Sequence, residues 1–593
     1  MHIIASVIAT DTDVLALLRK LRTETNFFIE CKRSNTKKDA STTKSTKASK
    51  TAKLNNVDEE KFSTYFDFKI SQKFIKPHQI LAINRGEALK VLSVKVVVPD
   101  FVFNRFSNFC AYRWINKGNF NHTRKRILEM SVKDSYTRLV QPYIVREVRS
   151  EMKSKAEKAS YEVFSTNLKQ LLLMPPLKGR PILGIDPGYS NGCKMAVISE
   201  TGSVLANAVV YPHKNKTDRD ATILRNMLKD HNCSLIALGN GTACRETEAW
   251  LSDLLQNNTF APLDVTYTIV NESGASIYSC SAEAKKEFSS LDPNIISAIS
   301  LARRVQEPLA ELVKVEPKHL GVGMYQHDLP KKQLEQALDE VVMECVSFVG
   351  VDLNTASQCL LKHIAGLTEK RAAQIIEYRE KKGSFVSRKQ LKEVKGIGPR
   401  VFEQCAGFLR VGPVTPNQSN EFYKNASTNR LDCTYIHPES YDVTLKVLKK
   451  LDLKLNDIGQ QSFINAVKLK IPLLNSVELS SSLGSSVETI NLILEALSKP
   501  LNFDLRSDCT QKPLFKKGLT SIYDLNVGCT VTGSVTNITH FGCFVDIGVG
   551  QDGLIHQSKL NGFNLQIGDK VEVKVINLEI DRKRIGLQTM NKL

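Results

Sequence analysis

Two phenylalanines near the carboxyl end of the chain, Phe541 and Phe544, have the spacing of residues that stack on nucleic-acid bases. They open a short alternating run that is typical of a strand in a small β-barrel. Rings presented on such a barrel stack on a single strand at roughly 1 to 3 kcal/mol per base, whatever its sequence. His556 offers a third ring or a hydrogen bond, and Lys583 and Arg584 offer charge to phosphate. A purely structural role for one of the two phenylalanines is the alternative.

Glycines at 366, 396 and 398 suggest a second kind of contact. Each lies between two short helical stretches, where a residue without a side chain lets the backbone approach a phosphate and the following helix start points its amides outward. Thr368 stands where the first turn would carry its second glycine, so the first copy is the weaker one. These units resemble paired helix-hairpin-helix motifs; the alternative is that they only pack helices. The candidate phosphate-binding residues are Gly366, Lys395, Gly396, Gly398 and Arg400.

The elements around these residues follow from apolar periodicity. Four apolar runs alternate with two helical stretches and predict a mixed α/β sheet that opens with a hairpin. The runs are Ile182 to Ile185, Lys194 to Ile198, Leu235 to Leu238 and Val265 to Val270, and the helices are Arg219 to Asp230 and Arg245 to Gln256. Runs at the carboxyl end predict a five-stranded barrel of the oligonucleotide-binding kind. They are Thr530 to Thr536, Cys543 to Ile547, Lys570 to Leu578 and Ile585 to Gln588.

Longer blocks carry a specific resemblance. The turn Asp186 to Gly188, the strand end Gly239 to Thr242, and the blocks Ser297 to Lys314 and Gly321 to Asp328 resemble the Tex family of transcription accessory proteins and its YqgF, or RNase H-like, domain. The resemblance covers residues 1 to 31 and about 60 to 593, favours a eukaryotic member, and implies an S1 domain at the end of the chain. The RNA-contacting positions that this resemblance implies are Phe541, Phe544, His556, Asp581 and Arg584.

An RNase H-like domain raises the question of hydrolysis. Nucleases of this kind gather several carboxylates around two divalent ions about 3.5 to 4 Å apart. Asp186 fits the first position and Glu272 could substitute for a second, but the third strand ends in Asn240 and not in an acid. Asp292 and Glu307 are only loose candidates for the remaining acid. We therefore expect no cofactor and interpret Asp186 as a turn or capping residue; a Mg²⁺-dependent nuclease or resolvase that uses Asp186 and Glu272 is the alternative.

The net charge and the cysteine content limit which class of partner and which cellular compartment we expect. The 593 residues include 81 Lys and Arg against 62 Asp and Glu, a formal charge of +19, which favours a polyanionic partner over a merely basic surface. Thirteen cysteines without Cys-x-x-Cys pairs indicate reduced thiols and disfavour a structural zinc site. Without a secretory signal or a long apolar run, an intracellular location, nuclear or cytoplasmic, is expected.

Together these patterns predict a multidomain chain, mainly α, with an RNase H-like α/β domain and a carboxyl-terminal five-stranded barrel. The predicted domains are 1–178 (helical, apparently shortened at its beginning, with a disordered Lys-rich insert at 32–60), 179–310, 311–412 with tandem hairpins, 413–520 as a helical linking domain, and 521–593. The predicted function is a nucleic-acid-binding scaffold in transcription or RNA metabolism. RNA would bind the barrel, DNA or structured nucleic acid would bind the hairpins, and the transcription machinery or the ribosome are possible partners. The alternatives are the nuclease and a protein-docking or translation-associated factor.

Overall fold

The computed structural model describes residues 1–34, 62–115, 122–214, 218–321, 323, 326–412, 429–474, 476–501, 503–508, 525–539, 541–549, 551–579 and 584–592. It divides into two compact units, Met1–Val163 with Tyr325–Lys331, and Phe164–Met324 with Lys332–Leu593. The predicted disordered insert therefore lies almost wholly outside the described residues. Among the described helices, none has both the length and the apolar composition that crossing a bilayer requires. The described cysteines carry free thiols.

The first unit combines helices with a small antiparallel sheet in the order β2-β1-β3. Strand β1 continues to Arg33, two residues into the segment predicted as an insert. Residues 122–172 form two α-helices, with a π-helical turn over Ser135–Val140 between them. Its elements are α1 (His2–Thr10), α2 (Thr12–Glu24), β1 (Phe28–Arg33), β2 (Phe68–Ser71), α4 (Pro77–Ala88), β3 (Leu92–Val97), α5 (Asp100–Cys110), α6 (His122–Asp134) and most of α7 (Gln141–Leu172).

The second unit contains the predicted mixed sheet, in the order β6-β5-β4-β7-β8. Strand β5 runs antiparallel to β4 and β6, whereas β7 and β8 run parallel to β4. Strand β6 was not predicted, because its alternating small and half-exposed residues give a weak apolar signal. The bounds are β4 (Ile182–Asp186), β5 (Cys193–Ile198), β6 (Val204–Val210), α8 (Asp218–Asp230), β7 (Leu235–Gly239), α9 (Cys244–Gln256) and β8 (Thr266–Val270).

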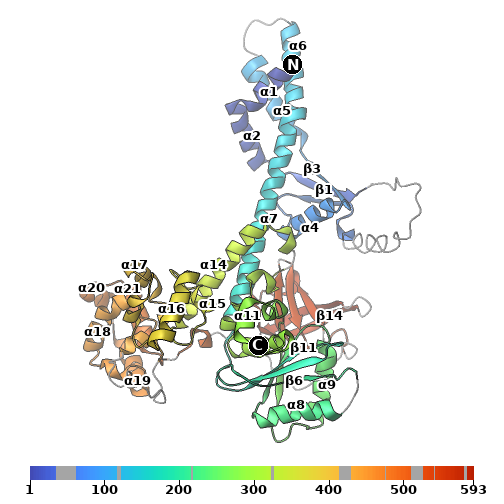
Figure 1. The fold of residues 1–593 in the computed structure, drawn as a ribbon. Coiled ribbons are helices and arrows are strands. Elements are labelled where there is room, and N and C mark those ends of the chain that lie inside the picture. The colour runs from blue at the N-terminus through green and yellow to red at the C-terminus, as the bar shows by residue number, and fades with distance from the viewer. Residues whose placement is uncertain are drawn as a thin grey trace. The chain divides into compact units, whose positions relative to one another are not determined.

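Both faces of this sheet are covered by helices (Figure 1). Leu183 and Ile185 of β4 share a core with α8 and α9, whereas Ile182 packs with α12 (Pro293–Gln306) on the opposite face. Between them, a Cβ at Gly184 would lie 2.0 Å from the carbonyl oxygen of Ala298, so glycine is what lets α12 lie close to the strand. Because side chains alternate along a strand, Asp186 belongs to the face that α12 covers.

Short helices and a barrel complete the second unit. The barrel closes in the order β11-β12-β13-β15-β14, and its core is filled by aliphatic side chains from every strand. This confirms the predicted fold class. The helices are α10 (Ala275–Ser279), α11 (Ala282–Glu287), α13 (Pro308–Leu312), α14 (Lys331–Val349), α15 (Gln358–Leu361), α16 (Glu369–Lys382), α17 (Pro399–Cys405), α18 (Tyr441–Lys450), α19 (Gln461–Lys470), α20 (Ser476–Leu483) and α21 (Val487–Leu497). The strands are β9 (Val351–Asp352), β10 (Leu409–Arg410), β11 (Thr530–Thr539), β12 (Gly542–Asp546), β13 (Asp552–His556), β14 (Lys570–Glu579) and β15 (Arg584–Lys592).

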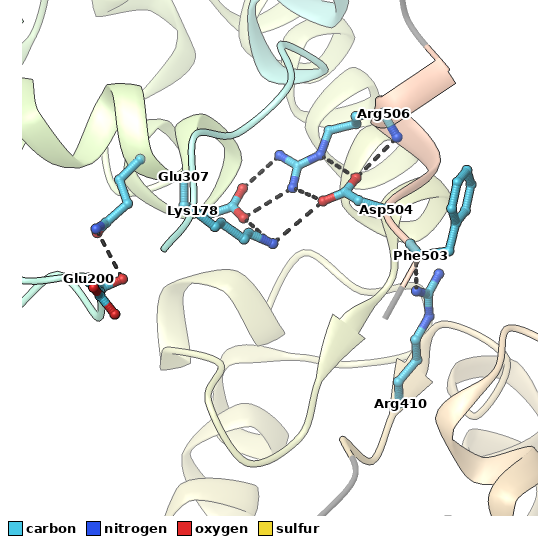
Figure 2. A network of polar contacts seen from close by, with 8 residues as sticks. Lys178, Glu200, Glu307, Arg410, Phe503, Asp504 and Arg506 are labelled. Carbon is cyan, nitrogen blue, oxygen red and sulfur yellow. Dashed lines mark hydrogen bonds and ion pairs between the residues drawn. The ribbon is translucent and has the colours of Figure 1, made fainter. Parts of the chain in front are cut away.

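An ion-pair network fixes the segment after α21 to the end of α12 (Figure 2). The guanidinium of Arg506 donates to both carboxylate oxygens of Glu307 and to both of Asp504. Lys178 reaches Glu307 at 2.9 Å and Asp504 at 3.5 Å. Arg506 is only 1% exposed, so its charge depends on these partners for compensation.

Candidate nucleic-acid interface

Two turns of the same geometry lie between the short helices of residues 346–410. In the first, the amide of Leu367 donates to the carbonyl of Ile364; in the second, the amide of Ile397 donates to Val394. Gly366 and Gly396 hold the third position of the turns with φ of +83° and +86°. A positive φ at that position is what a type II turn needs and what glycine provides without strain. The first and last residues of each turn, Ile364 with Leu367 and Val394 with Ile397, are buried and anchor the turns.

The second turn leaves its backbone open. A Cβ at Gly398 would meet nothing within 4 Å, and Gly398 directly precedes Pro399 at the start of α17. Lys395 and Arg400 flank this position and are exposed. An uncovered backbone beside two cations has the chemistry of a phosphate contact. Thr368 precedes α16 as its N-terminal cap residue, in the place that Gly398 has before α17.

Arg371 ties the two turns together, a role that the sequence did not indicate. Its Nε donates to the carbonyl of Gly396 at 3.0 Å, and its Nη1 donates to the carbonyl of Gly366 at 2.9 Å. One guanidinium therefore fixes two turns that are 30 positions apart in the chain. The only sequence signal was a basic residue in the first turn of α16, which resembles any other surface arginine.

In the barrel, the two phenylalanines lie at the junction of β11 and β12. Phe541 is in the turn, and Phe544 is in β12, paired with Asn537 on one side and Leu554 on the other. Cys543 and Val545, the neighbours of Phe544, point into the core, so the ring of Phe544 points outward. Both phenylalanines are half-buried, and their rings lie edge to face with centroids 6.0 Å apart. Neither ring is sealed in the core.

The other predicted barrel residues are only partly described. His556 is exposed at the end of β13, where it pairs with Gly542, and its Nδ1 accepts from the amide of Ser558. Arg584 is exposed at the start of β15, opposite Glu579. Asp581 and Lys583 lie outside the described residues, so their predicted roles stay predictions. Phe544 and His556 thus share one side of the strand pair formed by β12 and β13.

At the edge of the α/β sheet, the structure brings Asp186 and Glu272 together. A Cβ on Gly239 would lie 3.2 Å from Glu272 Oε2, and one on Gly241 would overlap Glu272 Oε1. The two glycines therefore leave the space in which the side chain of Glu272 crosses the end of β7. Burial raises the pKa of both carboxyls, and the charge of Asp186 raises that of Glu272 further. Asp186 is the last residue of β4, which corrects its interpretation as a turn or capping residue.

Two cationic side chains, Lys194 and Arg304, act on these two carboxylates. Lys194, 8% exposed, opposes Asp186 across β4 and β5, and its charge lowers the pKa of Asp186. The charges of Arg304 and Lys194 both lower the pKa of Glu272. Within the part of the chain that the structure describes, no group of three His, Cys, Asp or Glu side chains could hold a metal ion. Two carboxylates beside two fixed cations do not fit a two-ion hydrolytic centre.

The two loose candidates for a third acid have other roles. The Asp292 carboxylate caps α12 by accepting from the amide of Asn294. Glu307 is bound to Arg506 and Lys178 in the network of Figure 2. Asn240, at the third-strand position, accepts through Oδ1 from the amide of Glu272. Each of the three therefore stabilises the local structure.

Hairpin turns, a small closed barrel with outward rings and an RNase H-like sheet define a modular protein built from folds that recur in nucleic-acid-binding domains. Family comparisons divide the chain in the same way. They match the Tex central region-like family to residues 2–164, the Tex protein YqgF-like domain to 180–306, a helix-hairpin-helix motif to 346–410, an HHH domain to 429–506 and the S1 RNA binding domain to 524–589. The HHH domain falls where the sequence indicated only a helical linking region.

Similar proteins match most or all of the chain. The chain is 43% identical to human S1 RNA-binding domain-containing protein 1, over all of this chain and 63% of that protein. It is 40% identical to the uncharacterized protein YdcI of Bacillus subtilis, over 89% of this chain and 71% of that one. It is 36% identical to the protein tex of Bordetella pertussis, over 91% and 67%. The chain belongs to the Tex family, and it spans about 63% of the length of its human relative.

Proposed function

We propose that this protein is a nucleic-acid-binding scaffold that holds single-stranded RNA on the barrel and duplex or structured nucleic acid on the paired hairpin turns. The observation that carries the proposal is the position of Phe541 and Phe544. Their rings lie at the surface of a barrel whose interior is already filled by aliphatic side chains. Rings that the core does not require, beside exposed His556 and Arg584, suit base stacking with phosphate contact.

The hairpins support the second half of the proposal. The two turns share the same geometry and are joined by hydrogen bonds from Arg371. They would therefore present their main-chain amides to the phosphates of a nucleic acid as a single surface. Contacts of this kind position a duplex without reading its sequence. Recognition would therefore depend on backbone geometry and charge.

A role in transcription is part of the proposal. A relative in Neisseria gonorrhoeae, 37% identical over 89% of this chain, bears the name transcriptional accessory protein Tex. The helix-hairpin-helix and S1 modules of this chain suit a protein that holds RNA and duplex together. Binding to the transcription machinery or to the ribosome would follow from the nucleic acid that each carries.

The test is a binding titration against single-stranded RNA, single-stranded DNA and duplex DNA at several salt concentrations. Phe541→Ala with Phe544→Ala should weaken RNA binding by about tenfold or more while leaving the salt slope unchanged, because stacking releases no counterions. Gly398→Asp should depress duplex binding with little effect on RNA, and the open space around Gly398 allows that variant to fold. Unchanged RNA affinity in the double variant would refute the stacking surface.

The same titration separates the alternatives. If the nucleic acid keeps its full length with Mg²⁺ or Mn²⁺ present, for both the wild type and Asp186→Asn, the result argues for a scaffold. Cleavage by the wild type that Asp186→Asn abolishes would establish the nuclease. Weak binding that disappears at moderate salt regardless of the phenylalanines would favour a protein-docking role.

A further inference from the structure

Strand β6 forms an edge of the α/β sheet that is open to a further strand. It is the outermost strand in the order β6-β5-β4-β7-β8, and among the described strands it pairs with β5 alone. The outer side of such a strand presents a row of main-chain N–H and C=O groups that can pair with another chain. The seven residues of Val204–Val210 include no charged side chain and no proline. The strand therefore lacks the two residue types that most often keep an edge from pairing.

The edge strands of the same sheet and of the three-stranded sheet are protected elsewhere. In the first unit, the edge strands β2 and β3 carry the exposed side chains of Lys69 and Lys95. In the second unit, β8 lies beside the barrel, since Thr268 of β8 and Ser534 of β11 line one cavity. A charge or a covering element is a usual protection of an edge. Strand β6 has only a bulge at its start, and Ala206–Val210 pair with β5 residue for residue.

One face of β6 is uncovered as well. Ala206, Ala208 and Val210 pack in the core that the sheet shares with α8. Because side chains alternate along a strand, Asn207 and Val209 belong to the opposite face, where α12 packs on β4 and β5. Both residues are exposed, and Val209 keeps 38% of its surface in solvent. Helix α12 therefore does not shield β6, and an aliphatic side chain lies open beside the open edge.

The strand is already fixed in the geometry that pairing requires. Arg303 of α12 donates through Nε and Nη2 to the carbonyl of Gly202, at 2.9 and 2.8 Å. Gln306 donates through Nε2 to the carbonyls of Ser199 and Glu200, at 2.8 and 3.1 Å. These bonds hold the turn between β5 and β6 against the helix. Strand β6 would therefore lose little conformational freedom when a further strand pairs with it.

The composition of the edge suits a second copy of the same strand. A closed dimer requires a patch that is complementary to itself, and two antiparallel strands exchange their N–H and C=O groups symmetrically. An uncharged strand meets this requirement, because no side chain faces a like charge of its own image. The residue types are also symmetric about Asn207, since Ala206 and Ala208 flank it and Leu205 and Val209 come next.

We propose that β6 pairs with β6 of a second copy of this chain, antiparallel and about a two-fold axis near Asn207, so that the two sheets become one continuous sheet. Each copy contributes a single strand, which places the interface among the small ones. The dissociation constant is therefore expected on the order of 10 μM. This pairing does not depend on RNA binding by the barrel rings.

Sedimentation of the full chain, freed of nucleic acid, tests the proposal. Between about 1 and 100 μM the wild type should pass from one copy to two. Asn207→Lys places a cation against its own image, and Asn207→Asp places an anion there, so each should weaken the dimer by about tenfold or more. Asn207 is exposed, so both variants should fold. Asn257→Lys, at an exposed asparagine that follows α9, is the matched control and should dimerise as the wild type does.

An equal mixture of the Asn207→Lys and Asn207→Asp proteins separates direct pairing from a folding defect. Opposite charges then face each other across the axis, so the mixture should dimerise about as tightly as the wild type. The Phe541→Ala and Phe544→Ala double variant should also dimerise as the wild type does, which keeps this test apart from that of RNA binding. A wild type that remains a single copy at about 100 μM overturns the proposal and leaves a foreign strand as the occupant of the edge. A folded Asn207→Lys protein that dimerises fully, or a mixture that does not pair, overturns it too.

Discussion

The guanidinium of Arg506 lies against the carboxylate of Glu307, with its two Nη atoms 2.6 and 3.0 Å from the two carboxylate oxygens, although 198 residues separate them in the chain. The pair joins the end of the HHH domain to the end of α12 (Figure 2). It also explains why Glu307 is not available at the sheet edge as a third acid. A residue that looked like part of a hydrolytic site is part of the structural framework.

Replacing Arg506 should loosen this junction. Arg506→Met leaves Glu307 and Asp504 without their main cation, and removing one partner of a buried pair costs about 3 kcal/mol or more. Lys178→Met removes a cation that is 60% exposed in the same network and should cost less than about 1 kcal/mol. Hydrogen exchange of the amides of residues 503–508 measures the difference. Equal protection in both variants would show that the network does not hold the junction.

Arg371 should set the spacing of the hairpin turns. Arg371→Lys keeps the charge but cannot reach the carbonyls of Gly366 and Gly396 together, so duplex affinity should fall by about tenfold at an unchanged salt slope. Arg219→Lys makes the same chemical change at an exposed position in α8, away from the hairpins, and should alter affinity by less than about twofold. Duplex titrations at three salt concentrations measure both. Unchanged duplex affinity in a folded Arg371→Lys protein would show that this arginine does not set the spacing of the turns.

His363 makes the hairpin region sensitive to acid. Burial lowers its pKa from 6.5 to about 4, so the folded chain keeps the imidazole neutral where the unfolded chain protonates it. Stability is therefore full above about pH 6.5 and falls as the pH approaches 4, with about 2 kcal/mol lost by pH 5. Hydrogen exchange of α15 and α16 at about pH 7 and 5 should show this loss in wild type and a smaller one in His363→Leu. The same loss in both proteins would assign it to other groups.

Lys194 should limit the affinity of the Asp186 and Glu272 carboxylates for a divalent cation. Lys194→Met leaves Asp186 and Glu272 beside Arg304 alone, so the affinity for Mn²⁺ should rise by about tenfold over wild type. Electron paramagnetic resonance of free Mn²⁺ measures the change. Adding Asp186→Asn should remove the gain, and a Lys194→Met protein that binds Mn²⁺ no better than wild type would contradict the role given to Lys194.

The sequence alone determined the parts of this protein that depend on local pattern. Strand runs, the glycine turns and the S1 blocks are written in neighbouring residues, since burial and turn geometry select residue types at fixed short spacings. Two sequence blocks, residues 186–188 and 297–314, resemble the Tex family. That resemblance was sufficient to predict the fold class. Strand β6 was missed because an edge strand with small, half-exposed residues has little apolar contrast.

Only the tertiary structure decided which side chains meet. The sequence separates Asp186 from Glu272, Arg304 from Glu272, and Arg371 from Gly396, and nothing in the local pattern of each residue indicates its partner. Their pairing depends on how α12 packs against the sheet and how the two turns face each other, which is set by packing over the whole unit. The charge balance at the sheet edge and the shared arginine of the hairpins are therefore properties of the folded chain.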